Sequence, residues 1–114
     1  MPKRDNSLLL NDIQESGLKI QRYVLNLSFE QFQNDELRID AVIRNFEIIG
    51  EAARNLSPEF IAQNTTISWG EIIGYRNLLI HQYFGVSLQA VWNIIQDDLP
   101  ALITSVGLIM ENRN

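Results

Sequence analysis

The chain has 114 residues, of which 46% are hydrophobic and none is cysteine. This length suits one domain with a single core, and the lack of cysteine excludes both a disulfide framework and a thiolate zinc site. The formal net charge of −5 excludes capture of nucleic acid by a broad basic surface, because such binding is largely phosphate neutralisation, so any RNA contact has to be local.

The sequence carries no signal for a membrane. No apolar run approaches the roughly 18 consecutive residues that a membrane span requires. The first residues, Met1 to Asn6, are charged, and the apolar triplet Leu8–Leu10 is too short for a signal peptide. We therefore expect a soluble protein of the cytoplasm. The acidic balance fits a solvated surface and equally fits docking to a basic partner, and composition leaves both open.

The first half of the sequence predicts two long helices. Apolar residues recur at three- and four-residue steps near the start, which predicts a helix over about 5–24. Ser28, followed three residues later by Gln31, has the form of a capping box and predicts the start of a second helix. Because the periodicity continues to Leu56, this second helix is expected to run that far, with a bend near Asn34-Asp35.

Two further helical starts follow. Ser57 stands before a proline at the first helical position, which predicts a short helical turn over 58–63. Ser68 and Glu71 repeat the capping-box pattern and predict the start of the next helix. That helix should end near Gly85, because glycine tolerates the left-handed geometry of a helix end.

The end of the sequence predicts a last long helix. Ser87 can cap it, and an apolar stripe then extends from Leu88 to Ile109. Pro100 lies inside this stripe and should kink the helix or split it after Asp97-Asp98. No segment shows sustained two-residue alternation, so the predicted fold class is all-α. Four main helices with short connections and one short helical turn favour an antiparallel bundle.

The single histidine, His81, limits the chemistry that the chain can perform. A two-histidine metal site is impossible within one protomer, and we expect neither a metal nor another cofactor. Arg76 lies five residues earlier. A guanidinium suits a phosphate, and imidazole is the side chain best matched to proton transfer near neutral pH. At about 100° per residue the two side chains lie about 140° apart on a helix. A shared site needs the arginine to reach around the helix, a distortion near the helix end, or a second subunit.

Spacing alone favours an ordinary structural role for both residues. A single histidine near a helix end more often caps the helix or packs in the core, and Arg76 would ordinarily pair with Glu47 or Glu71. On these grounds, without a further observation, the function stays undecided.

Two other groups of residues admit a functional interpretation. Glu47 and Glu51, with Arg44, could support the catalytic pair from the neighbouring helix, but a solvated stripe of ion pairs is the simpler interpretation. Trp69 and Trp92 could stack RNA bases, but their helical phase favours packing in the core.

The string Arg76-x4-His81-x-Tyr83 is similar to the R-x4-H-x-Y motif of HepT toxins, which belong to the HEPN superfamily. The likeness extends through the flanks and covers most of the chain from about Asp40 onward. The similar segments are Ala41–Ala53, Leu56-Ser57-Pro58, Trp69–Gly74, Tyr83–Val86, Val91-Trp92 and Asp98-Leu99-Pro100.

The resemblance implies a single HEPN domain over residues 1–114 that forms a two-fold dimer with both motifs facing one cleft. It implies a metal-independent endoribonuclease in which Arg76 and His81 are catalytic. Asn77 matches the polar residue that commonly follows the arginine, and it could orient His81 or bind the phosphate. Tyr83 matches the tyrosine that the cognate antitoxin, a minimal nucleotidyltransferase of the MntA type, modifies with AMP.

A second function belongs to a different class and stays open. The chain could be a non-catalytic, dimeric interaction module of the HEPN fold that binds a nucleotidyltransferase partner. The complete set of Arg76, His81 and Tyr83 favours the enzyme. The acidity and the lone histidine suit a binding domain equally well.

Overall fold

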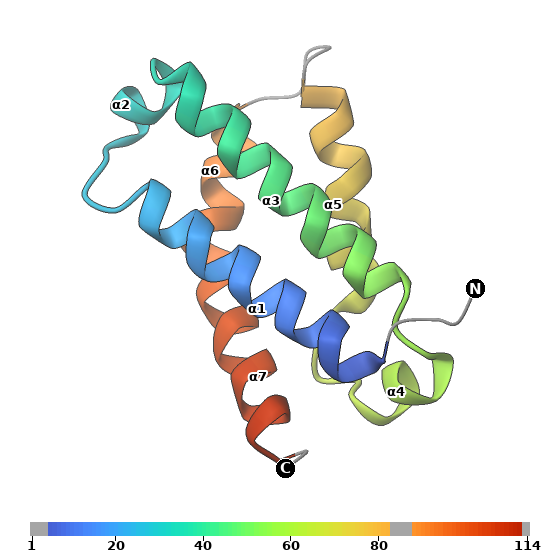
Figure 1. The fold of residues 1–114 in the computed structure, drawn as a ribbon. Coiled ribbons are helices and arrows are strands. Elements are labelled where there is room, and N and C mark those ends of the chain that lie inside the picture. Colours follow the sequence, from blue (N-terminus) through green and yellow to red (C-terminus); the bar gives the residue numbers. More distant parts are fainter. Residues whose placement is uncertain (1–4, 83–87, 113–114) are drawn as a thin grey trace.

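The structure, a computed structural model, describes residues 5–82 and 88–112, except for the side chains of 77–82. Within these ranges it contains helices and no strand, which confirms the all-α fold class (Figure 1). The elements are α1 (Asn6–Tyr23), α2 (Phe29–Gln33), α3 (Glu36–Arg54), α4 (Pro58–Gln63), α5 (Trp69–Gln82), α6 (Leu88–Asn93), the π-helix η1 (Ile94–Asp98) and α7 (Leu99–Asn112).

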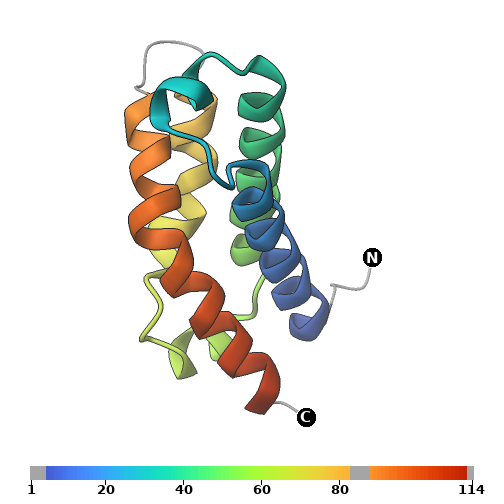
Figure 2. The ribbon, with the colours of Figure 1, turned by 90° about the vertical axis from the view of Figure 1, so that its left-hand side faces the viewer.

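The long helices form an antiparallel bundle. Helix α1 packs along α3 and α7, and α3 packs along α5. Successive rods run in opposite directions, with α6, η1 and α7 together making the fourth rod (Figures 1 and 2). The predicted bundle of four main helices is therefore confirmed for the described part of the chain. In that part, no helix has the length and apolar character needed to cross a membrane.

The first helix has the bounds that its sequence predicts. Asp5 caps it by accepting a hydrogen bond from the backbone N–H of Ser7 at 3.0 Å, and Val24 ends it. Its periodic apolar residues, such as Ile13 and Ile20, are fully buried. The three- and four-residue spacing therefore marks the face that packs on α3 and α7.

The expectation of one bent helix from Ser28 to Leu56 is wrong, because the chain forms two separate helices there. The predicted capping box is confirmed: the Ser28 N–H donates to Gln31 Oε1 at 2.9 Å, and the Gln31 N–H donates to Ser28 Oγ at 3.1 Å. Asp35 then caps α3 by accepting from the Arg38 N–H at 3.1 Å. An N-cap residue has a non-helical backbone, so a helix cannot run through Asp35.

The second half of the chain follows its predicted breaks. The short helix α4 covers the predicted residues, with the Phe60 N–H donating to Ser57 Oγ at 3.2 Å. Of the two outcomes predicted for Pro100, the kink is confirmed, and the last rod is not split. Instead the chain widens into η1, in which the Leu99 N–H donates to the carbonyl of Ile94, and the rod bends there (Figure 2). Because proline lacks an N–H and crowds the preceding turn, a wider turn accommodates it.

The predicted helix end near Gly85 and the predicted cap Ser87 lie outside the described residues.

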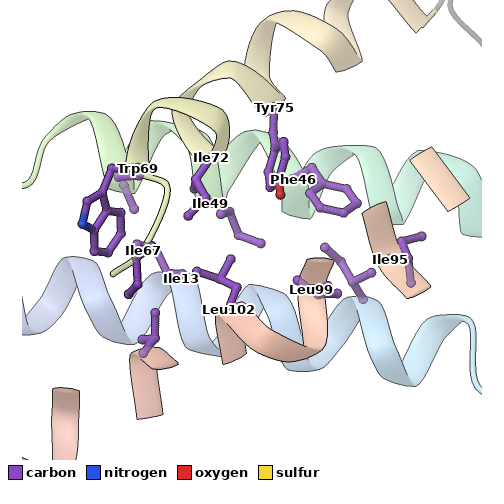
Figure 3. Packing of buried hydrophobic residues seen from close by; sticks show 14 of the residues in the cluster. Ile13, Phe46, Ile49, Ile67, Trp69, Ile72, Tyr75, Ile95, Leu99 and Leu102 are labelled. Carbon is purple, nitrogen blue, oxygen red and sulfur yellow. The ribbon is translucent and has the colours of Figure 1, made fainter. Parts of the chain in front are cut away.

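The core lies between the four rods. Figure 3 shows Ile13, Phe46, Ile49, Ile72, Leu99 and Leu102 converging from different helices. Trp69 is buried in this core, and its Nε1–H donates to the Asn64 carbonyl at 2.9 Å. Trp92 packs partly buried against Phe29 and Phe32. Both tryptophans therefore pack as their helical phase indicates.

Candidate functional site

Helix α5 carries both Arg76 and His81, the two residues proposed for catalysis. Five residues of α-helix separate them by about 7.5 Å along the axis and about 140° around it. The side chains of Asn77 and His81 are not described, and Tyr83 lies outside the described residues. The positions of their functional groups therefore stay predictions, and Arg76 is the described side chain of this proposed site.

Arg76 reaches across to the neighbouring helix. Its Nη1 lies 3.1 Å from Oε2 of Glu51 on α3. The sequence predicted Glu47 or Glu71 as its partner, and that prediction is wrong, because the contact is made one helical turn beyond Glu47. Side-chain exposure is 41% for Arg76 and 50% for Glu51. An ion pair this exposed contributes about 0–1 kcal/mol, so the guanidinium can leave it for another anion.

The backbone of Arg76 packs closely against α3, whereas its guanidinium group is half-exposed. A Cβ atom built on Gly50 of α3 would lie 3.1 Å from Arg76 Cβ and 3.3 Å from Arg76 N. It would also lie 3.4 Å from the carbonyl oxygen of Ile72. Glycine therefore permits a close approach of α3 to α5 at the residue that carries the guanidinium. The base of Arg76 is fixed by packing, while its charged end remains half-exposed.

A hollow lies beside Arg76, and we call it the arginine hollow. It has a volume of about 380 Å³ and is formed by α1, α3, Asn55 and Arg76. Its charged and polar lining residues are Asp12, Arg44, Glu47, Glu51, Asn55 and Arg76. The described lining therefore contributes two guanidinium groups and three carboxylates, so its charge is mixed. This mixed charge agrees with a local contact to one phosphate better than with a broad basic surface.

The acidic side chains of α3 form a stripe of ion pairs. Arg44 Nη1 lies 3.6 Å from Glu47 Oε2, and Arg54 Nη1 lies 3.7 Å from Glu51 Oε2. Asn55 Nδ2 also lies 3.4 Å from Glu51 Oε1. The predicted stripe of ion pairs on this helix is confirmed. Glu47, proposed as a supporting residue, lines the arginine hollow but pairs with Arg44 along its own helix.

Sequence reasoning missed Gly50. A glycine inside a helix costs about 0.5–1 kcal/mol relative to alanine, so its presence at an interior position indicates a close backbone approach. That signal was available from the sequence, although it could not name Arg76 as the residue approached.

Metal ligands are not gathered in the described part of the structure. Among the side chains described there, no group of three or more His, Cys, Asp or Glu residues is placed to hold a metal ion. The His81 side chain is outside that set.

Comparison with known proteins gives a consistent set of relatives. The chain matches the family described as "Ribonuclease HepT-like" over residues 13–109. It is 36% identical over 109 residues to a "Putative RNase" of Methanocaldococcus jannaschii, covering 96% of this chain and 100% of that protein. It is 40% identical over 99 residues to a "Putative RNase" of Caldanaerobacter subterraneus subsp. tengcongensis, covering 87% and 88%.

A third relative carries the more specific name "Probable ribonuclease HepT" and comes from Thermococcus cleftensis. It is 38% identical over 100 residues, which cover 88% of this chain and 91% of that protein. No solved structure gives a significant match.

Proposed function

The chain belongs to the family of HepT-like ribonucleases, and we propose that it is the toxin of a type VII toxin–antitoxin pair of the HepT and MntA kind. As a HEPN-type ribonuclease it is an enzyme. The proposed activity is endonucleolytic cleavage of RNA that uses no metal ion. An RNA substrate makes the cytoplasm the proposed place of action.

The proposed reaction is an internal transfer at phosphorus. The ribose 2′-oxygen attacks the adjacent phosphorus, the new P–O2′ bond replaces the P–O5′ bond, and the products are a 2′,3′-cyclic phosphate and a free 5′-hydroxyl. The attacking hydroxyl loses a proton and the leaving 5′-oxygen gains one. His81 is proposed to move these protons, a contribution of about 10²–10⁴-fold to the rate.

Arg76 is proposed to hold the phosphate and to stabilise the negative charge that develops on its oxygens. The observation that carries the proposal is the position of the Arg76 side chain, which is half-exposed and lines the arginine hollow. Its backbone is fixed by the close approach of Gly50. Its ion pair with Glu51 is weak enough for a phosphate to displace. Asn77, the next residue, is proposed to orient His81 or to share the phosphate.

A homodimer is proposed to complete the site. Each chain has one histidine, and one imidazole cannot act as base and as acid in the same step. Positions 76 and 81 also lie about 140° apart around a helix such as α5. A two-fold arrangement with both motifs facing one cleft supplies a second histidine and lets the arginine of one protomer serve the histidine of the other.

The proposed antitoxin is a nucleotidyltransferase of the MntA type that transfers AMP to Tyr83. The support for this is the family pattern, in which a tyrosine stands two residues after the histidine. The added phosphate would bring a negative charge close to Arg76 and compete with the phosphate of RNA. The alternative function, a non-catalytic module that binds the same partner, predicts a complex without any RNA cleavage.

Digestion of RNA by the purified protein tests the proposal. We expect His81→Ala and Arg76→Ala each to abolish cleavage while keeping the thermal melting transition of the wild type. Arg22→Ala is the matched control, because Arg22 is an exposed arginine on α1 that does not line the arginine hollow. Cleavage by folded His81→Ala at the wild-type rate would refute the assignment. Absence of cleavage by the wild type would favour the interaction module.

A further inference from the structure

A second hollow lies away from the arginine hollow, and we call it the acidic hollow. It has a volume of about 190 Å³ and is formed by the segment before α5, the first half of α5, the end of η1 and the start of α7. Its polar lining includes the carboxylates of Glu71, Asp97 and Asp98 and the hydroxyl of Tyr75. Among the residues that the structure describes, the two hollows have no lining residue in common.

The charge of this hollow is uncompensated. Glu71, Asp97 and Asp98 are exposed, and among the described residues no lysine, arginine or histidine lines the hollow. In the part of the chain that the structure describes, none of the three carboxylates forms an ion pair. The carboxylates of the arginine hollow behave differently, because Glu47 and Glu51 are paired with arginines. The acidic hollow therefore presents a local negative potential to solvent.

Tyr75 adds an unpartnered polar group to the acidic hollow. Its side chain extends from α5 toward the segment that carries Leu99 and Leu102 (Figure 3) and lines the acidic hollow. The residue is only 8% exposed, and its ring packs edge-on against Phe46 at 5.5 Å. Within the described residues its hydroxyl has no hydrogen-bond partner. The oxygen is not among the described buried polar atoms that lack a partner, so it opens into the acidic hollow, where it can accept a hydrogen bond from a ligand.

The protonation state of Tyr75 fits a cationic ligand. Burial, and then the negative charges of Asp98 and Glu71, raise the pKa of Tyr75 to about 12. The phenol therefore stays neutral at physiological pH and keeps acceptor lone pairs on its oxygen. A positive group with an N–H could donate a hydrogen bond to this oxygen. The same group would balance the negative charge of Asp98 and Glu71.

The volume of the acidic hollow and the placement of its carboxylates indicate which kind of cation it can bind. The three carboxylates are not placed to hold a metal ion among the described residues. The volume of about 190 Å³ is below the roughly 300–1,000 Å³ of sites for whole small molecules, so it suits one side chain. A guanidinium has five N–H donors in a planar fork that matches carboxylate pairs, and it is less strongly hydrated than an ammonium group.

We propose that the acidic hollow binds the guanidinium group of an arginine side chain presented by a partner protein. This binding site is separate from the proposed catalytic site, and binding to it can be measured without any RNA cleavage. Its success or failure is therefore independent of the proposed ribonuclease mechanism.

A titration of the full chain with capped arginine (N-acetyl-argininamide), followed by the backbone amide shifts in NMR, tests the proposal. We expect saturable shifts at Glu71, Tyr75 and Asp98, with a millimolar Kd. Capped citrulline has the same shape without the charge and should bind at least about tenfold more weakly. Free arginine should bind no more tightly than capped arginine. Tighter binding of free arginine would instead assign the hollow to a free amino acid and overturn the partner-protein proposal.

Variants locate the binding. Glu71→Gln, Asp98→Asn and Tyr75→Phe should each weaken the binding of capped arginine by about threefold to tenfold. Glu59→Gln is the matched control, because it removes the same charge from an exposed residue of α4 that lines neither hollow, and it should bind as the wild type does. Equal weakening by Glu59→Gln, or shifts confined to the arginine hollow, would overturn the proposal. Tyr75→Phe removes only the hydroxyl. If its melting transition matches that of the wild type, the variant is folded, and any weaker binding reports the loss of the hydroxyl.

Discussion

Replacing Gly50 by alanine should displace the proposed catalytic arginine without unfolding the protein. The new Cβ would lie 3.1 Å from Arg76 Cβ and 3.3 Å from Arg76 N, whereas carbon atoms pack comfortably at about 3.5–4.0 Å. These neighbours are the backbone and the first side-chain carbon of α5, so no rotation of a flexible side chain relieves the contact. Helix α5 has to move by about half an ångström at Arg76.

Two opposing terms set the change in stability. Alanine is a better helix former than glycine by about 1 kcal/mol, and overpacking costs about 1–3 kcal/mol. The net loss is therefore about 0–2 kcal/mol, which lowers the Tm of a domain of this size by up to roughly 15 °C. The effect on catalysis is larger, because a misplacement of about 1 Å can cost about 10²-fold in rate. We expect Gly50→Ala to cleave RNA about 10–100-fold more slowly than the wild type.

Gly74→Ala is the matched control for this experiment. Gly74 lies on α5 itself, and a Cβ built there meets no described atom within 4 Å. The same substitution should therefore raise the Tm by several degrees through helix propensity, by about 1 kcal/mol, and leave cleavage within about twofold. The assay is cleavage of a fluorogenic RNA at subsaturating concentration, with thermal melts of both variants. Cleavage by Gly50→Ala at the rate of Gly74→Ala would refute the reasoning that this contact positions Arg76.

Three further predictions concern the ion pair, the modified residue and a helix cap. Glu51→Gln should free Arg76 and lower the KM for RNA by up to about fivefold with little change in kcat, and a raised KM in steady-state kinetics would contradict this. Tyr83→Phe should remain an active nuclease that the antitoxin cannot silence, and mass spectrometry showing an AMP adduct on another residue would count against it. Hydrogen bonds from the backbone N–H of Arg38, and then from its side chain, lower the pKa of Asp35 in the folded protein. The ionised Asp35 therefore stabilises the fold fully above its unfolded-state pKa, and this stabilisation is lost as the pH falls through its lower folded-state pKa. Asp35→Asn should therefore lower the free energy of unfolding in urea at neutral pH and have no effect in strong acid, and a pH-independent difference would disprove the mechanism.

The sequence predicts local structure well wherever a side chain acts on its own backbone. The cap at Ser28 and the proline start at Pro58 are confirmed for this reason, since each depends on residues at most three positions away. The break at Asp35 was missed because the apolar periodicity continues on both sides of it. Pro100 predicted a kink or a split, but the choice between them, and the π-helix that forms the kink, depend on how the last rod packs.

The candidate site was predictable in its residue types and not in its contacts. The pattern from Arg76 to His81 identified the helix that carries both residues. The ion pair of Arg76 with Glu51, and not with Glu47, depends on the axial register between α3 and α5. That register is fixed by packing between residues far apart in the sequence, including the close approach at Gly50, and a local pattern carries no information on it.

The products of RNA cleavage test the central claim most directly. Purified wild-type protein and His81→Ala are incubated with a defined RNA in excess EDTA, and the new ends are identified by mass spectrometry. The proposed mechanism predicts 2′,3′-cyclic phosphate and 5′-hydroxyl ends from the wild type and none from His81→Ala. Intact RNA with the wild type, 5′-phosphate ends, or the same products from the folded His81→Ala variant would contradict it.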